Sequence, residues 1–184
     1  MDRQFRKVAG LVDGELLETG VRTDGMSRLV FHALQSLIEE KNVQPALYFR
    51  SAAAGTSWST NLAVRHGLVL RRAHDAVASS LTTSAILLVE ECDVIVLIGV
   101  DMTYVPLVQY LQSRGVEVEI WAWHDPHTAI LRKVADTFVA LNAMLTDYSG
   151  HAVPTGPLGK YTGETDEKEG SNTRHYRNCM SIAY

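Results

Sequence analysis

Three aspartates in this sequence share one setting, since each follows a short, strand-like apolar run; they are Asp13, Asp75 and Asp101. Apolar runs of this kind are typical of strands buried in a parallel sheet. Carboxylates that lie close together repel one another unless a cation neutralises them, and Mg²⁺ or Mn²⁺ prefers such oxygen ligands. A cation of this type retains bound water that can attack a phosphodiester. The three aspartates therefore predict a divalent metal site whose carboxylates are catalytic.

The run before Asp101 has the clearest pattern in the chain. Val94–Ile98 is unbroken and ends at Gly99, which predicts a central, fully buried strand. A helix is expected directly after it, capped by Thr103 and with Pro106 in its first turn. Asp101 is thus expected at the carboxyl end of a central strand, where open α/β sheets bind their ligands.

Similar patterns predict the remaining elements. Further strands are expected at residues 8–12, 45–49, 68–70, 116–123 and 138–141, the last as a strand or as an apolar strip packed on the sheet. Helices are expected at residues 27–41, 58–66, 75–91 and 128–135. Glu117 and Glu119 alternate with apolar residues, so one face of their strand is expected to be partly wet. Alternating strands and helices predict an α/β fold with a doubly wound, mainly parallel sheet.

Composition limits the classes of protein and the cellular setting. The 184 residues carry a net charge of −4, which gives no overall attraction to nucleic acid or to an anionic membrane. No apolar segment reaches the length of a membrane span and no signal-peptide pattern is present, so we expect a cytoplasmic protein without a membrane partner. Cys92 and Cys179 are far apart and are expected to be free thiols. Residues 1–145 are expected to form the domain and 146–184 a flexible or partner-ordered extension.

Other side chains near the aspartates are candidates for substrate binding, each with a plainer alternative. Arg72 and His74 are expected either to offer a basic lip to phosphates or to be ordinary surface charges around a turn. Trp123 is expected either to stack on an exposed base or to be buried, and burial is expected for at least one of Trp121 and Trp123. Any of the aspartates can also serve as a turn former or a helix cap.

The order of these motifs resembles that of the NYN domains, a family in the PIN-like group of nucleases. The family's apolar strand followed by Asp-Gly-x-Asn is similar to Leu11-Val12-Asp13-Gly14-Glu15-Leu16. Its Lys-Gly-Val-Asp-like segment is similar to Arg72-Ala73-His74-Asp75. Its Ser-Gly-Asp-x-Asp-Phe-x-Pro-Leu motif is similar to Gly99-Val100-Asp101-Met102-Thr103-Tyr104-Val105-Pro106-Leu107. The closing Ser-x-x-Leu and Ala-Asp-x-Phe motifs resemble residues 128–131 and 135–138, so the resemblance covers about residues 6–142.

The resemblance implies a five-stranded sheet in the order 3-2-1-4-5, with helices on both faces and with Asp13 and Asp101 at the ends of neighbouring strands. It also implies Mg²⁺ or Mn²⁺ held by Asp13, Asp101 and Asp75, although Asp75 is equally well read as a cap. Two departures bear on function: Leu16 stands where the first motif has an amide, and Thr103 replaces the second acid of the Asp-x-Asp pair. Thr103 can hydrogen-bond a metal-bound water but brings no negative charge.

Three functions are compatible with these features. The first is a metal-dependent endoribonuclease that hydrolyses RNA phosphodiesters. The second is a catalytically degenerate scaffold of the same family that binds RNA or a protein partner. The third is another α/β enzyme that handles phosphates, but the sequence has no Gly-rich phosphate loop to support it. A homo-oligomer and a complex with a protein partner are both compatible with the sequence.

Overall fold

The computed structural model describes residues 6–21, 24–55, 58–126 and 128–143. The strands are β1 (Val8–Asp13), β2 (Val43–Ser51), β3 (Val69–Ala73), β4 (Val94–Ile98), β5 (Glu117–Ala122) and β6 (Thr137–Ala140). The helices are α1 (Gly14–Thr19), α2 (Asp24–Glu40), α3 (Trp58–Arg65), α4 (Val77–Leu88), α5 (Val105–Ser113) and α6 (Leu131–Val134). Two short 3₁₀ turns, η1 (Ala52–Ala54) and η2 (Met102–Tyr104), complete the described elements.

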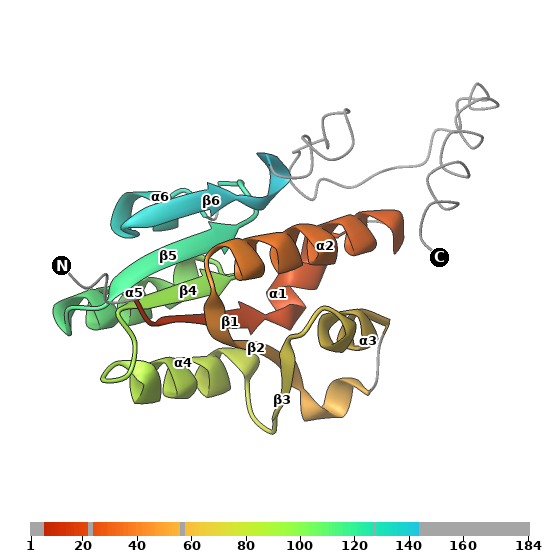
Figure 1. Ribbon diagram of the computed structural model, residues 1–184, viewed down its shortest axis with the longest axis horizontal. Helices are drawn as coiled ribbons and strands as arrows, with labels where there is room; N and C mark the ends of the chain where they lie inside the picture. The colour runs from red at the N-terminus through yellow and green to blue at the C-terminus, as the bar shows by residue number, and fades with distance from the viewer. Residues whose placement is uncertain (1–5, 22–23, 56–57, 127, 144–184) are drawn as a thin grey trace.

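The six strands form one parallel sheet in the order β3-β2-β1-β4-β5-β6 (Figure 1). The order 3-2-1-4-5 implied by the resemblance is confirmed, and β6 extends the sheet to a sixth strand. The segment expected as a strand or an apolar strip is therefore a strand, at residues 137–140. Because the chain order reverses between β1 and β4, the carboxyl ends of these two central strands flank the switch point where such sheets bind ligands.

Helices cover both faces of the sheet, and neighbouring strand residues enter different layers. Leu11 and Leu97 pack in the cluster that includes buried residues of α4, α5 and α6. Val12 and Ile98 pack in the cluster that includes buried residues of α1, α2 and α3. All five residues of β4 are buried, which is why its sequence reads as an unbroken apolar run. The doubly wound architecture is thus confirmed.

One expectation about local structure is wrong, and a second is correct only in part. Thr103 does not cap the helix after β4: the side chain of Asp101 caps η2 by accepting a hydrogen bond from the Thr103 backbone N–H, and α5 follows with Pro106 in its first turn. The strand at 117–122 is exposed to solvent at Glu117, whose side chain is 37% exposed, but not at Glu119, which is only 5% exposed. Lys41, the residue after α2, lies 2.9 Å from a carboxylate oxygen of Glu119, and Trp121 Nε1 donates to the same oxygen at 2.7 Å. These partners offset the free-energy cost of burying the Glu119 carboxylate.

The remaining expectations about the whole chain are tested only in part. None of the helices within the described residues has the length and apolar character needed to cross a membrane. Cys92 is a half-buried free thiol, whereas Cys179 and the expected extension at 146–184 lie outside the described residues. The cytoplasmic location stays a prediction from the sequence.

Candidate functional site

Asp13 is the last residue of β1, and Asp101 lies just beyond the carboxyl end of the neighbouring strand β4. Val12 of β1 is paired with Ile98 of β4, and each aspartate follows shortly after its member of that pair. Gly99 makes the turn out of β4 with a φ of 69°. A Cβ on Gly99 would lie 2.9 Å from the Asp13 carbonyl oxygen, so glycine is needed for the close approach of the two strand ends.

The carboxylate of Asp13 is buried, at 3% exposure, and accepts three hydrogen bonds. Its Oδ1 accepts from the backbone N–H groups of Glu15 and Leu16 at 3.1 and 3.0 Å, which caps α1. Its Oδ2 accepts from the hydroxyl of Tyr104 at 2.5 Å. Burial raises the pKa of Asp13 above its ordinary value, and these three hydrogen bonds only partly oppose that rise.

Asp101 is half-buried and bonds within its own turn. Its Oδ1 accepts from the Thr103 backbone N–H at 2.9 Å and from the Thr103 hydroxyl at 2.5 Å. Its Oδ2 accepts no hydrogen bond within the described part of the chain. Asp101 therefore keeps one carboxylate oxygen for a ligand, while Thr103 steadies the other.

Tyr104 connects the two aspartates, because its backbone N–H donates to the Asp101 carbonyl oxygen at 3.1 Å and its hydroxyl donates to Asp13. Sequence reasoning missed it as a site residue. Its ring is buried, and burial together with the charges of Asp13, Asp101 and Glu15 raises the pKa of its hydroxyl. The hydroxyl consequently remains a donor to Asp13. The sequence signal was available: Tyr104 stands three residues after Asp101, in the first turn at a strand end.

The other expected site residues lie farther away. Asp75, Arg72 and His74 are exposed at the end of β3, and Arg72 donates to the Gly55 carbonyl oxygen at 3.0 Å. Since β2 separates β3 from β1, the end of β3 lies about 10 Å from the end of β1 along the sheet. Among the described residues, no three His, Cys, Asp or Glu side chains form a group that could hold a metal ion. The structure thus brings Asp13 and Asp101 to one edge and does not bring Asp75 to them.

The two tryptophans at the end of β5 have structural partners. Trp121 is fully buried, as expected for at least one of the pair. Trp123 is half-buried, and its Nε1 donates to the Leu17 carbonyl oxygen at 3.0 Å. It also packs closely on Gly20, where a Cβ would clash with its ring. A base could reach only the part of Trp123 that these contacts leave open.

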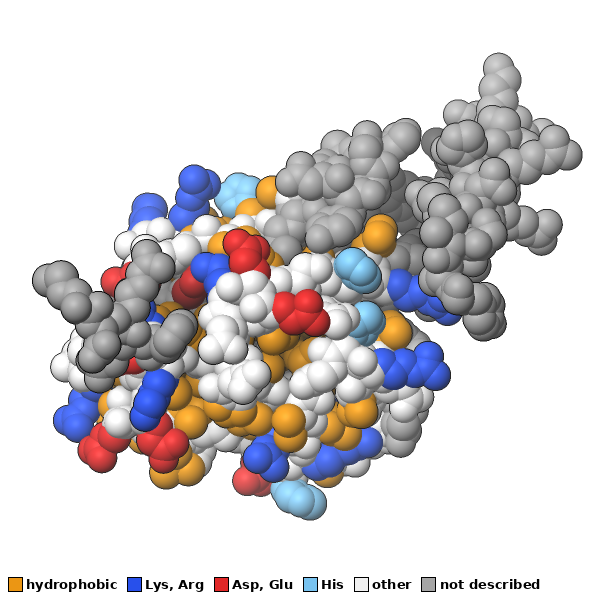
Figure 2. Space-filling model, viewed as in Figure 1, with side chains coloured by type: hydrophobic (Ala, Val, Ile, Leu, Met, Phe, Trp, Pro, Cys, Tyr) orange, Lys and Arg blue, Asp and Glu red, His pale blue; other side chains and the backbone are white. Residues whose placement is uncertain are grey.

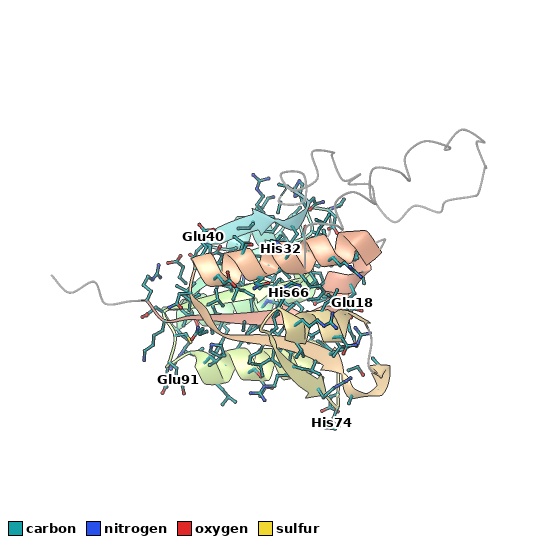
Figure 3. The ribbon with its side chains drawn as sticks, turned by 45° about the vertical axis from the view of Figure 1, so that its right-hand side comes forward. Glu18, His32, Glu40, His66, His74 and Glu91 are labelled. Atoms are coloured by element: carbon teal, nitrogen blue, oxygen red, sulfur yellow. The ribbon has the colours of Figure 1, made fainter. Side chains whose placement is uncertain are left out.

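A second polar cluster, which the sequence did not indicate, ties α1 to β2 and α3. Glu18 Oε1 accepts hydrogen bonds from Tyr48, Arg50 and Ser59, with the Tyr48 hydroxyl at 2.8 Å. Figure 3 shows Glu18 and His74 at one end of the molecule, with Glu40 and Glu91 at the opposite end. In Figure 2, Lys, Arg and His side chains lie along the right-hand side of the face shown, and further Lys and Arg side chains lie on its left-hand side.

A doubly wound parallel sheet with aspartates at the ends of its two central strands defines a PIN-like α/β domain. The chain belongs to the NYN domain family, whose model matches residues 8–142. That match spans nearly the whole described domain.

Two solved structures are similar to the chain. A protein of unknown function, VPA0982 from Vibrio parahaemolyticus RIMD 2210633, is 20% identical with a TM-score of 0.65, over 78% of this chain and 98% of that protein. The MAR1 ribonuclease from Caenorhabditis elegans is 13% identical with a TM-score of 0.45, over 85% of this chain and 97% of that protein. No curated protein sequence matches the chain. The first likeness supports the fold, and neither likeness assigns an activity.

The carboxylate oxygens of Asp13 and Asp101 can be compared with the ligands that a divalent cation requires. Mg²⁺ is commonly bound through one or two carboxylates, several waters and the phosphates of the substrate. Asp13 and Asp101 supply two carboxylates at one edge, and the Oδ2 of Asp101 has no other partner within the described residues. Both oxygens of Asp13 already accept hydrogen bonds. The residues therefore fit a weakly held cation that the substrate helps to bind.

Proposed function

We propose that this NYN domain protein is a metal-dependent ribonuclease that cleaves RNA phosphodiesters at the carboxyl ends of β1 and β4. The observation that carries the proposal is the placement of Asp13 and Asp101 beyond the paired ends of the two central strands. Family membership supports the same class of chemistry. Asp13 and Asp101 would hold Mg²⁺ or Mn²⁺, which supplies an activated water and neutralises charge on the phosphate.

The chain's own residues divide the remaining tasks. Tyr104 and the N-terminus of α1 fix the orientation of Asp13, whereas Thr103 orients Asp101. Arg72 and His74 are exposed at the end of β3 and would contact phosphates of a bound strand away from the reacting bond. Asp75 lies two strands away from Asp13. We therefore place it at the rim of the surface that would bind RNA and not among the ligands of the cation.

Thr103 limits metal affinity in this proposal. A negative charge about 4 Å from the cation contributes about 4 kcal/mol at an effective dielectric constant of about 20, before desolvation is counted. A net third of that energy changes affinity about tenfold. Cleavage is therefore expected to be slow, to need millimolar Mg²⁺ and to improve with Mn²⁺.

The test is cleavage of a labelled single-stranded RNA at increasing Mn²⁺. Asp101→Asn is expected to abolish cleavage, and Thr103→Asp to lower the Mn²⁺ requirement about tenfold, because the new carboxylate restores one unit of charge. Thr83→Asp is the matched control, since it adds the same charge on the exposed face of α4. Absence of cleavage by the wild type under every divalent metal would refute the proposal.

A second candidate is a catalytically inactive NYN domain that binds RNA. It is favoured by the hydrogen bonds that occupy both oxygens of Asp13 and by the hydroxyl in place of an acid at Thr103. In that case the wild type binds RNA without cleaving it, and Asp101→Asn leaves the affinity unchanged. Cleavage of the labelled RNA at increasing Mn²⁺, measured beside the affinity of the wild type and Asp101→Asn for the same RNA, thus separates the two candidates.

A further inference from the structure

The carboxylate of Glu18 joins three elements at the carboxyl edge of the sheet. Its Oε1 accepts hydrogen bonds from Tyr48 and Arg50 of β2 and from Ser59 of α3, and Arg50 also donates to Ser59 Oγ at 3.1 Å. Only 21% of the Glu18 side chain and 12% of the Arg50 side chain are exposed. Replacing a desolvated ion pair by apolar residues is often neutral for stability, whereas its directional bonds fix where the carboxylate lies.

Glu18 belongs to α1, the helix whose N-terminus holds Asp13. The backbone N–H groups of Glu15 and Leu16 donate to Asp13 Oδ1, so the orientation of that carboxylate depends on the position of α1. α1 has only six residues, too few for a helix that is stable without tertiary contacts. Its position is consequently set by the contacts that it makes with the rest of the domain.

Those contacts hold α1 from two sides. On one side, Leu17 is buried and its carbonyl oxygen accepts from Trp123 Nε1 at 3.0 Å. On the other side, the ring of Tyr48 packs against the first residue of α1, where a Cβ on Gly14 would lie 2.4 Å from it. The Tyr48 hydroxyl then donates to Glu18 in the last turn at 2.8 Å. Glu18 is therefore the polar anchor of α1 on the side of β2 and α3.

We infer that Glu18 is a positioning residue for the candidate metal site, which acts through α1 to hold the Asp13 carboxylate beside Asp101. A further polar contact between α1 and β2, from the Ser51 N–H to Glu15 Oε1 at 3.2 Å, is exposed, so water competes with it. Loss of the Glu18 anchor lets the N-terminus of α1 move away from Asp13. A cation at this site rests on the proposed function, whereas the orientation of Asp13 by α1 does not.

The first experiment is amide hydrogen exchange of the full, metal-free chain, followed by NMR. Glu18→Ala is expected to lower the protection of the Glu15 and Leu16 amides at least about tenfold, because α1 loses hydrogen bonds to a charged group. The amides of β4 are expected to keep their protection. Glu18→Gln retains an oxygen acceptor and is expected to keep most of the protection. Lys41→Met, the matched control, breaks the pair with Glu119 just before the start of β2 and is expected to leave both amides protected.

The second measurement is the affinity of the same proteins for Mn²⁺ alone, by electron paramagnetic resonance. Glu18→Ala is expected to bind Mn²⁺ about ten- to a hundredfold more weakly than the wild type, as is typical when a residue that orients a metal ligand is lost. Lys41→Met is expected to bind Mn²⁺ as the wild type does. A pair that served stability alone would affect the two variants alike.

Two results would overturn the inference. One is unchanged protection of the Glu15 and Leu16 amides in Glu18→Ala, or an equal loss in Lys41→Met. The other is wild-type affinity for Mn²⁺ in Glu18→Ala. If the wild type binds no Mn²⁺, the metal-dependent function fails, while a selective loss of amide protection still supports the orientation of Asp13 by Glu18.

Tyr48→Phe decides the question if Glu18→Ala does not fold. It removes one donor to Glu18 and keeps the ring against Gly14. The variant is expected to lower the protection of the Glu15 and Leu16 amides by a smaller factor than Glu18→Ala. Unchanged protection in Tyr48→Phe would then overturn the inference.

Discussion

The carboxylate of Asp13 is held by three donors in a buried position, yet its pKa is raised, because burial outweighs those hydrogen bonds. The folded protein then binds a proton at a pH where the unfolded chain has already lost it. Stability therefore falls as pH rises above the ordinary value of 3.8, and the burial cost is complete once the pH exceeds the folded-state pKa. Asp13 is in this sense a destabilising residue at neutral pH, as residues retained for function often are.

Asp13→Asn removes this titration. The amide oxygen still caps α1, and the side chain no longer ionises, so the variant is expected to melt at a higher temperature than the wild type at neutral pH. The difference is expected to disappear as the pH is lowered into the range where Asp13 is protonated in the folded state. Thermal unfolding across this range is the measurement.

Tyr104→Phe serves as the contrast, since it leaves Asp13 charged and removes one donor, which costs about 1–3 kcal/mol. Its melting temperature should fall, most strongly at neutral pH. A lower melting temperature for Asp13→Asn at neutral pH would show that the ionised Asp13 carboxylate stabilises the folded protein instead of destabilising it.

At the scale of elements, the pair formed by Lys41 and Glu119 joins the end of α2 to β5. Lys41→Met is expected to destabilise the protein by about 1–3 kcal/mol, because it leaves a buried carboxylate without its cation. Adding Glu119→Gln should recover much of the loss, since the amide oxygen still accepts from Trp121 Nε1. Urea unfolding of the wild type, Lys41→Met and the double variant measures both steps. Equal stability of all three proteins would show that the pair contributes nothing.

The same pair shows what a local pattern cannot predict. Alternation predicted the β5 strand correctly, but it also predicted an exposed Glu119, because the period of a strand contains no information about Lys41, which lies far away in the sequence. α1 has no counterpart among the expected helices for a related reason. It has only six residues and depends on its cap by Asp13 and on packing of Leu17, not on intrinsic helix stability.

At the scale of the whole molecule, the sheet was predictable because its central strands are buried on both faces. β4 reads as one apolar run, and the order of motifs implied its neighbours. The same order correctly predicted that Asp13 and Asp101 follow adjacent strands. The same order already placed β2 between β3 and β1, but it could not predict the position of Asp75, which also depends on the course of the loop before α4. Nor could it predict the hydrogen bond from Tyr104 to Asp13, which joins side chains of different elements.

The last prediction concerns how much of the chain the domain needs. The two hydrophobic clusters and all six strands are built from residues 8–141, and the family match ends at residue 142. Because these elements already cover both faces of the sheet, a chain that ends at Gly150 is expected to keep a single cooperative unfolding transition with a melting temperature close to that of the full chain. Thermal unfolding of the two proteins, followed by circular dichroism, is the comparison. A broad or strongly lowered transition in the shorter chain would show that residues 151–184 pack as part of the core.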